Sequence, residues 1–348
     1  MQRVVDRKSN MEYRMWNVGK PPFVPSYDIF AILAYSTYYM VNVLNAIAPL
    51  FLIIFATAFL QRVRNIGENW ANVLNEYALN IGLPVLIFSS LSKAHVSFSE
   101  QSALVIYNSF FIIATFVAAF LIGKIARLEK RMFRTFFLCL IFGNVAYLGI
   151  PVLVQISGES ILPTVSVIIA VYLFWLFTIG TGFLDFQQQH SKKDVFRNIA
   201  KNLLKNPLLI SVFLGVFLAS FAVTLPSVLA RSLDMIAASV TPTVLIVIGL
   251  FIGKSKIGRL TEGIPVFIFS LMTLVLLPAG FYFGVQLFGF SPSQFSASII
   301  QAGMPLAITP FALADKFGLH KAFIARSIVL STILSVASLA FWISIFTT

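Results

Sequence analysis

Charge and cysteine are what this sequence has least of. Only 11% of its 348 residues are charged, whereas a soluble domain carries roughly 25%, so the charges are too few to cover a soluble globule. The single cysteine, Cys139, excludes a disulfide framework or a cysteine-based metal site within one chain. The three histidines (His95, His190 and His320) form no ligand cluster, and we expect no metal and no cofactor.

Catalytic motifs are missing as well. The sequence contains no HExxH, no GxSxG and no paired aspartates within an apolar run, so a reaction at membrane depth has no candidate residues. We therefore expect a protein that is not an enzyme. A purely structural or signalling role is also disfavoured, because the interrupted helices described below reduce stability without serving such a role.

Apolar residues are in excess. They make up 58% of the chain, and the mean hydropathy is +0.90, which predicts an all-α polytopic membrane protein. The net charge of +12 does not indicate nucleic-acid binding. Nearly all Lys and Arg lie in short breaks between apolar runs, where topology signals and contacts with anionic lipids occur.

Ten apolar runs approach the length of about 20 residues that a membrane span requires. We predict transmembrane helices at 41–61, 71–92, 102–123, 134–156, 162–184, 206–223, 227–252, 264–287, 294–315 and 322–346. The loops after the odd-numbered spans hold 17 Lys and Arg, whereas the even-numbered loops and the C-terminal end hold one, Lys93. The positive-inside rule places the odd-numbered loops in the cytoplasm and both ends of the ten-span core outside it, in a plasma membrane or bacterial inner membrane.

The first 39 residues do not fit this pattern. The segment IFAILAYSTYY (29–39) is too short to span, and it follows a basic stretch and the linker-like PPFVP. We interpret residues 1–39 as an N-terminal extension that is peripheral or forms an interfacial helix. Translation starting at Met40 is an alternative.

The chain also repeats itself. APLFLIIFATAFL (48–60) aligns without gaps with NPLLISVFLGVFL (206–218), an offset of 158 residues. The same offset relates two prolines and an acid across two spans: Pro49 and Pro207, Glu76 and Asp234, Pro84 and Pro242. A five-span unit must enter the membrane from the opposite side when it is repeated, as in the inverted repeats of secondary transporters. The units are 40–185 and 206–348, joined by a cytoplasmic loop at 186–205.

Spans 4 and 9 are both interrupted. FGNVAYLGIP (142–151) and QAGMPLAITPFALADKF (301–317) place helix-breaking residues inside apolar runs. Freed backbone groups survive at that depth only inside protein or beside a wet cavity. We therefore predict two broken helices that cross at their breaks, although ordinary proline kinks are the alternative. The residues of the breaks are Gly143, Gly149, Pro151, Gly303, Pro305 and Pro310.

The breaks suggest a site for a carboxylate. Positive helix N-termini favour anions, and the amide of Asn144, with Gln301 as a weaker second, could assist. Glu76 and Asp234 lie eight residues before Pro84 and Pro242 and are candidates for binding a coupling proton or cation. Since both lie near span ends, simple interfacial positions are the alternative, and Arg231 could be the i,i+3 partner of Asp234.

Four motifs together resemble the auxin efflux carrier family: GNVAYLGIPVL in span 4, NEYALNIGLPVLIF in span 2, KNP at the start of span 6 and AGMPLAITPFALADKFGLHKAF in span 9. That family includes plant PIN-type auxin exporters and bacterial carriers of malonate, malate and other organic anions. The resemblance covers about residues 40–348.

The resemblance implies a scaffold of spans 1, 2, 6 and 7 and a transport domain of spans 3–5 and 8–10. The fourth and ninth helices would cross, an anion would bind beside the crossing, and homodimers would work by an elevator-type motion. It also implies that Asn144 contributes to carboxylate binding and that Pro305 is the crossing proline of span 9. We predict a substrate site formed by these two residues together with Gly143, Tyr147, Gln301 and Met304. Plant members carry proline at the position of Gly143 and commonly glutamine at that of Leu306, which argues against auxin itself.

We therefore expect a secondary transporter that moves a small organic anion, an auxin-like or dicarboxylate molecule, by alternating access. The alternative is a sodium-coupled symporter of the bile-acid type, which shares the crossed-helix plan.

Overall fold

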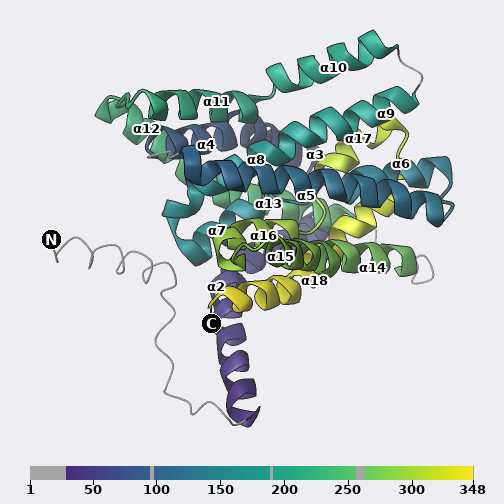
Figure 1. The fold of residues 1–348 in the computed structure, drawn as a ribbon, viewed down its shortest axis with the longest axis horizontal. Helices are drawn as coiled ribbons and strands as arrows, with labels where there is room; N and C mark the ends of the chain where they lie inside the picture. Colours follow the sequence, from purple (N-terminus) through teal and green to yellow (C-terminus); the bar gives the residue numbers. More distant parts are fainter. Residues whose placement is uncertain (1–28, 95–97, 189–190, 256–262, 348) are drawn as a thin grey trace.

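The computed structural model describes residues 29–94, 98–188, 191–255 and 263–347. Within these ranges the chain is helical and has no β-strand, only one isolated bridge. Figure 1 shows the arrangement. The α-helices are α2 (Ile29–Arg64), α3 (Glu68–Tyr77), α4 (Leu83–Ser92), α5 (Phe98–Ile125), α6 (Lys130–Cys139), α7 (Gly149–Ser157), α8 (Leu162–Trp175), α9 (Thr181–Gln187), α10 (Lys192–Leu204), α11 (Pro207–Ser220), α12 (Ser227–Ala238), α13 (Val240–Lys254), α14 (Gly263–Leu271), α15 (Leu277–Leu287), α16 (Ser296–Ala302), α17 (Thr309–Phe317) and α18 (Lys321–Thr347).

Seven helices of the described chain are long and apolar enough to cross a membrane, or up to eight if a bent pair counts as one span. An all-α, multi-pass membrane protein is therefore confirmed. The seven fall on predicted spans 1, 2, 3, 5, 7, 8 and 10, while predicted spans 4 and 9 are broken into shorter helices. The seven are Met40–Arg64, Asn69–Ser92, Gln101–Ile125, Glu159–Gln187, Ser227–Lys254, Gly263–Leu287 and Lys321–Phe346.

The second helix of the bent pair, α11, lies where span 6 was predicted, and the first, α10, lies in the predicted loop 186–205. Helices α10 and α11 meet at an angle of 56°. Lys205 is the C-cap of the first helix and Asn206 the N-cap of the second: the Asn206 Oδ1 accepts hydrogen bonds from the N–H groups of Leu208 (2.9 Å) and Leu209 (3.2 Å). Pro207 takes the first helical position, where a missing N–H costs little. The KNP motif is therefore a helix start.

Helix α2 begins earlier than predicted. It runs without a break from Ile29 to Arg64, so residues 29–39 continue the first span instead of forming a separate short helix. No proline or glycine lies between Ile29 and Pro49, and a started helix propagates readily through such a segment. In Figure 1 the first turns of α2 project from the body of the molecule. Residues 1–28 of the predicted extension, together with His95 and His190, lie outside the described residues.

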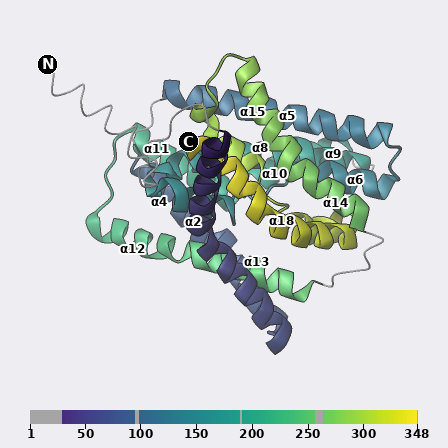
Figure 2. The same cartoon turned by 90° about the horizontal axis from the view of Figure 1, so that it is seen from below.

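Two glycines let α13 pack directly on α2, and the two helices cross at an angle in Figure 2. A Cβ atom on Gly249 would lie 2.5 Å from the carbonyl oxygen of Ile54, and one on Gly253 would lie 2.3 Å from that of Ala58. The spacing of four residues puts both glycines on one helix face, the small-xxx-small pattern by which membrane helices approach closely.

Prolines within spans 2 and 8 follow π-helical turns. The turn Ala78–Gly82 precedes Pro84, and the turn Met272–Leu276 precedes Pro278. A wider turn relieves the clash between a proline ring and the preceding carbonyls. At the first of these turns a Cβ on Gly82 would lie 3.1 Å from the side chain of Val240, so the middle of span 2 packs on the start of α13.

Candidate functional site at a helix crossing

The first break separates α6 from α7. Residues 140–148 between them are not α-helical, and all but two of them are buried. The carbonyl of Asn144 accepts from the N–H groups of Leu148 (3.3 Å) and Gly149 (3.0 Å), which starts the turn leading into α7. Pro151 follows in the first turn of that helix, where a proline is tolerated. The FGNVAYLGIP stretch thus ends one helix and starts the next.

The second break separates α16 from α17. Helix α16 ends at Ala302, Gly303 follows as its C-cap, and α17 starts at Thr309 with Pro310 in its first turn. Met304 and Pro305 lie in the interruption, and Met304 is 1% exposed.

The two breaks cross. The N–H of Asn144 donates to the carbonyl of Pro305 (2.7 Å), and the N–H of Ala307 donates to the carbonyl of Phe142 (2.9 Å). These bonds frame the isolated antiparallel bridge between Gly143 and Leu306. Residues more than 160 positions apart are thereby joined through their backbones. Of the two interpretations of the interrupted spans, the described structure has the crossing.

Two amides lie unpartnered at this crossing. Gln301 is 1% exposed, and neither its Nε2 nor its Oε1 has a hydrogen-bond partner in the described chain. Asn144 is 5% exposed; no hydrogen bond joins its side chain to the described residues, but its amide is not among the fully buried groups that lack a partner. A buried amide without a partner is unfavourable by about 1–3 kcal/mol, so the Gln301 side chain is positioned to gain from a polar ligand or water.

Three backbone N–H groups of the same segment also lack an acceptor in the described chain. The N–H groups of Val145, Ala146 and Tyr147 directly follow Asn144 and have no acceptor among the described residues. They form the N-terminal turn leading into α7, where orphan N–H groups and the helix dipole favour negative charge. The site thus combines two neutral amides with a run of free donors.

The glycines at the crossing differ in how much room there is for a side chain. A Cβ on Gly149 would lie 3.4 Å from the Gln301 amide, and one on Gly303 would lie 3.2 Å from Pro278. A Cβ on Gly143 would meet nothing closer than 3.7 Å, which is ordinary contact distance. Gly143 is therefore at the break, as predicted, but the space around it does not require a glycine.

A hydroxyl ties the first break to α3. The Tyr147 hydroxyl donates to Oδ1 of Asn75 at 2.8 Å. Sequence reasoning named Tyr147 but missed Asn75, because nothing in the spacing of span 2 relates it to span 4. Ser331 of α18 was missed for the same reason, and its Oγ accepts from the N–H of Leu306 at 3.1 Å.

Three cavities adjoin the crossing. A small one of about 10 Å³, room for about one water, is lined by Gly143, Gln301 and Met304. Cavity A, of about 620 Å³, is lined by α4, α7, α8 and α12 and includes Ile150, just after Gly149. Cavity B, of about 580 Å³, is lined by α3, α13, α17 and α18 and includes Asn75 and Ile308.

Neither acid considered for coupling lines the small cavity at the crossing. Glu76 is exposed on α3 and lines none of these cavities. Asp234 lines cavity A, where it is paired with Lys93 and accepts from Ser89 Oγ at 2.9 Å. The expectation that Arg231 pairs with Asp234 is wrong, because the end of α4 brings Lys93 to that carboxylate. In the described chain no three His, Cys, Asp or Glu residues gather as a metal site would require.

Comparison with known proteins identifies the family of the chain. The family described as membrane transport protein matches residues 42–343, most of the chain. The chain belongs to this family. It is the auxin efflux carrier family, which the four sequence motifs resemble, so that prediction is confirmed. As a member of this transport family, the chain is a membrane transporter.

Two relatives extend the comparison. An uncharacterized transporter of Methanocaldococcus jannaschii is 26% identical over 280 residues, covering 79% of this chain and 89% of the relative. A protein of Rhizobium meliloti named "Putative malonate transporter" is 23% identical over 305 residues, covering 86% of this chain and 94% of the relative. Both alignments take in most of each chain.

Proposed function

We propose that this transporter is a secondary carrier of a small organic anion and that the crossing of the two breaks binds the anion's carboxylate. The observation that carries the proposal is the pairing of unpartnered amides on Asn144 and Gln301 with the free N–H groups of residues 145–147. A carboxylate offers only acceptors, and this cluster offers mainly donors. Charge-assisted hydrogen bonds of this kind are the strong ones.

The two large cavities support alternating access. Cavity A is lined by residues of the loops after predicted spans 2 and 4, which the positive-inside rule assigns to the outside. Cavity B is lined by residues next to the loops after predicted spans 1, 7 and 9, assigned to the cytoplasm. Cavity A reaches the first turn of α7 at Ile150, next to the first break, and cavity B reaches the second break at Ile308. Rocking of the segment that carries the crossing would expose the carboxylate site to one cavity and then the other.

The proposal includes a ten-helix, inverted-repeat architecture. The two broken segments would each count as one span beside the seven helices and the bent pair. The contact between Gly82 and Val240 supports it, because these residues are 158 positions apart, the offset of the sequence repeat. Equivalent residues of two repeats meet where a two-fold axis passes between them. The scaffold and transport domains, the elevator motion and the homodimer are further parts of the proposal.

The substrate class is proposed as small mono- or dicarboxylates. One relative is named for malonate, and Leu306 stands where plant exporters commonly carry glutamine. No coupling ion is assigned, since Asp234 is already paired and Glu76 is exposed and lines none of the three cavities.

A ligand screen tests the proposal. The purified protein is heated with malonate, malate and indole acetate, and with malonamide as an uncharged counterpart of malonate. A carboxylate that binds the folded state should raise the melting temperature in a saturable way, and malonamide should not. Equal shifts with malonate and malonamide, or none with any carboxylate, would contradict an anion site. Uptake measured with and without a sodium gradient tests the alternative, since strict sodium dependence would favour a symporter of the bile-acid type.

A further inference from the structure

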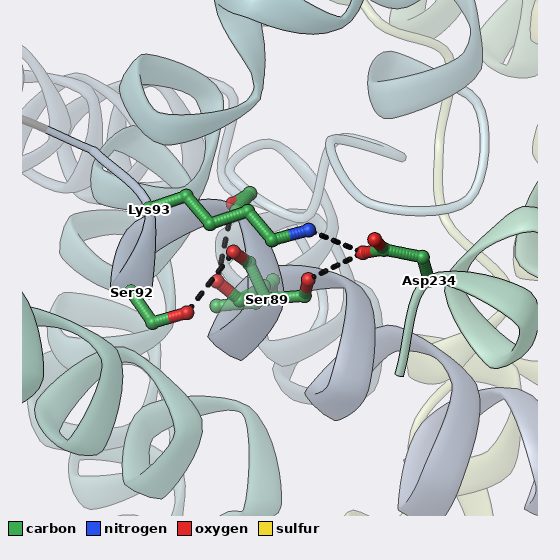
Figure 3. Close-up of polar contacts among 6 residues, drawn as sticks. Ser89, Ser92, Lys93 and Asp234 are labelled. Atoms are coloured by element: carbon green, nitrogen blue, oxygen red, sulfur yellow. Dashed lines mark hydrogen bonds and ion pairs between the residues drawn. The ribbon is translucent and has the colours of Figure 1, made fainter. Parts of the chain in front are cut away.

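An ion pair lies on the wall of cavity A, away from the crossing. Lys93 follows the last turn of α4, and its ammonium contacts Oδ1 of Asp234 on α12. Ser89, one turn earlier on α4, donates to the same carboxylate oxygen at 2.9 Å. Figure 3 shows both side chains reaching Asp234 from the same helix end. The three residues join two elements that are 141 or more positions apart in sequence.

The pair is open to solvent. The Lys93 and Asp234 side chains are 49% and 52% exposed, and both line cavity A. Exposed ion pairs are weak because water competes with each partner. An ammonium also has three donors, and only the bond to Asp234 occupies the Lys93 ammonium among the described contacts. The lysine can therefore take a second anion at little cost.

Lys93 is also unusual in its position. It is the only Lys or Arg in the loops after the even-numbered spans and at the C-terminal end, which the charge distribution assigns to the outside. The same cavity is lined by hydroxyls of Ser89, Ser90 and Ser160. Its volume of about 620 Å³ is within the range of small-molecule sites. A second carboxylate, Glu159, also faces the cavity, so the resting charge of its wall is negative.

We propose that Lys93 is a receiving site for the anion in cavity A and that Asp234 is its built-in competitor. In the absence of substrate the Asp234 carboxylate occupies the ammonium. An incoming substrate carboxylate displaces it, with the cavity hydroxyls as additional donors, before moving on to the crossing. This inference rests on the proposed anion transport and adds a second site to it.

Removing the charge of Lys93 and removing that of Asp234 should then have opposite effects on the KM for malonate. In a purely structural ion pair the two changes would have the same effect. Lys93→Gln removes the receiving charge and should raise the KM for external malonate about fivefold, the size expected for one partly exposed charge contact. Asp234→Asn removes the competitor and one negative charge, and should lower that KM. Lys93→Arg keeps the charge and should stay close to the wild type.

The measurement is uptake of radiolabelled malonate into right-side-out membrane vesicles, with the melting temperature of each variant recorded alongside. Asp194→Asn is a matched control, because Asp194 forms an exposed pair with Arg197 (2.9 Å) and lines neither large cavity. It should leave the KM unchanged.

An equal rise in KM for Lys93→Gln and Asp234→Asn, or no change in either, would overturn the inference while leaving anion transport in place. A loss of uptake in Asp234→Asn would instead indicate that the Asp234 carboxylate binds a coupling cation. That result would also overturn the inference. If the wild type neither binds nor takes up malonate or another carboxylate, the proposed function falls and the receiving site with it.

Discussion

The Tyr147 hydroxyl donates a 2.8 Å hydrogen bond to Oδ1 of Asn75, which joins the first break to α3 on the wall of cavity B. Tyr147→Phe removes only this bond and should change the transport rate severalfold, because one hydrogen bond contributes about 0.5–1.5 kcal/mol. Its melting temperature should change little.

The same contact can be tested by a double-mutant cycle. Asn75→Ala alone and with Tyr147→Phe should give effects on the transport rate that do not add, with a coupling of about 0.5 kcal/mol or more. Additive effects would mean that the hydroxyl acts independently of Asn75.

Asn144→Ala should abolish most anion binding and leave the fold intact. The crossing uses the backbone N–H and carbonyl of this residue, and alanine keeps both. Loss of an amide bond to a carboxylate should weaken binding roughly 10- to 100-fold, since hydrogen bonds to charged groups contribute about 1.5–3 kcal/mol. Isothermal titration of purified protein measures it. Binding and transport equal to the wild type would rule out Asn144 as a substrate ligand.

Gln301→Met should separate stability from binding. Methionine has a similar shape but no amide, so it removes an unsatisfied buried group that is unfavourable by about 1–3 kcal/mol. The melting temperature of the ligand-free protein should therefore stay level or rise, while carboxylate affinity falls. A drop in both would indicate that the Gln301 amide is already satisfied in the folded protein, contrary to its lack of partners in the described chain.

Gly253→Ala should destabilise the protein. Its Cβ would lie 2.3 Å from the Ala58 carbonyl oxygen, and forcing α2 and α13 apart should cost about 1–3 kcal/mol. Gly280→Ala is the control, because a Cβ there meets nothing within 4 Å. Thermal unfolding in detergent compares the two. If both variants had the same melting temperature, the close approach of α2 and α13 would contribute nothing to stability.

Much of the fold could be predicted because each membrane span is a long apolar run that is recognisable in the sequence. Apolar length located seven helices, and the glycines and prolines of 142–151 and 301–317 marked the two breaks. Propensity did not find the start of α2, since residues 29–39 were judged on their own length and not as part of a helix that continues to Arg64.

The site was only partly visible in the sequence. Gln301 and Asn144 stood out as amides in apolar surroundings, but Asn75 and Ser331 are polar residues of ordinary spans. Their role depends on contacts between distant segments, which periodicity does not encode. Lys93 was likewise seen as a topology signal, while local spacing suggested Arg231 as the partner of Asp234.

The joint between Asn144 and Pro305 is made of main-chain atoms alone. Side chains on either crossing segment can therefore be exchanged by mutation without breaking this hydrogen bond, as long as position 144 keeps its N–H. Gly143 illustrates this freedom, since its own N–H bonds to Ile141 and takes no part in the crossing. Substitutions that change what the crossing binds can therefore accumulate one residue at a time while the backbone crossing itself is kept.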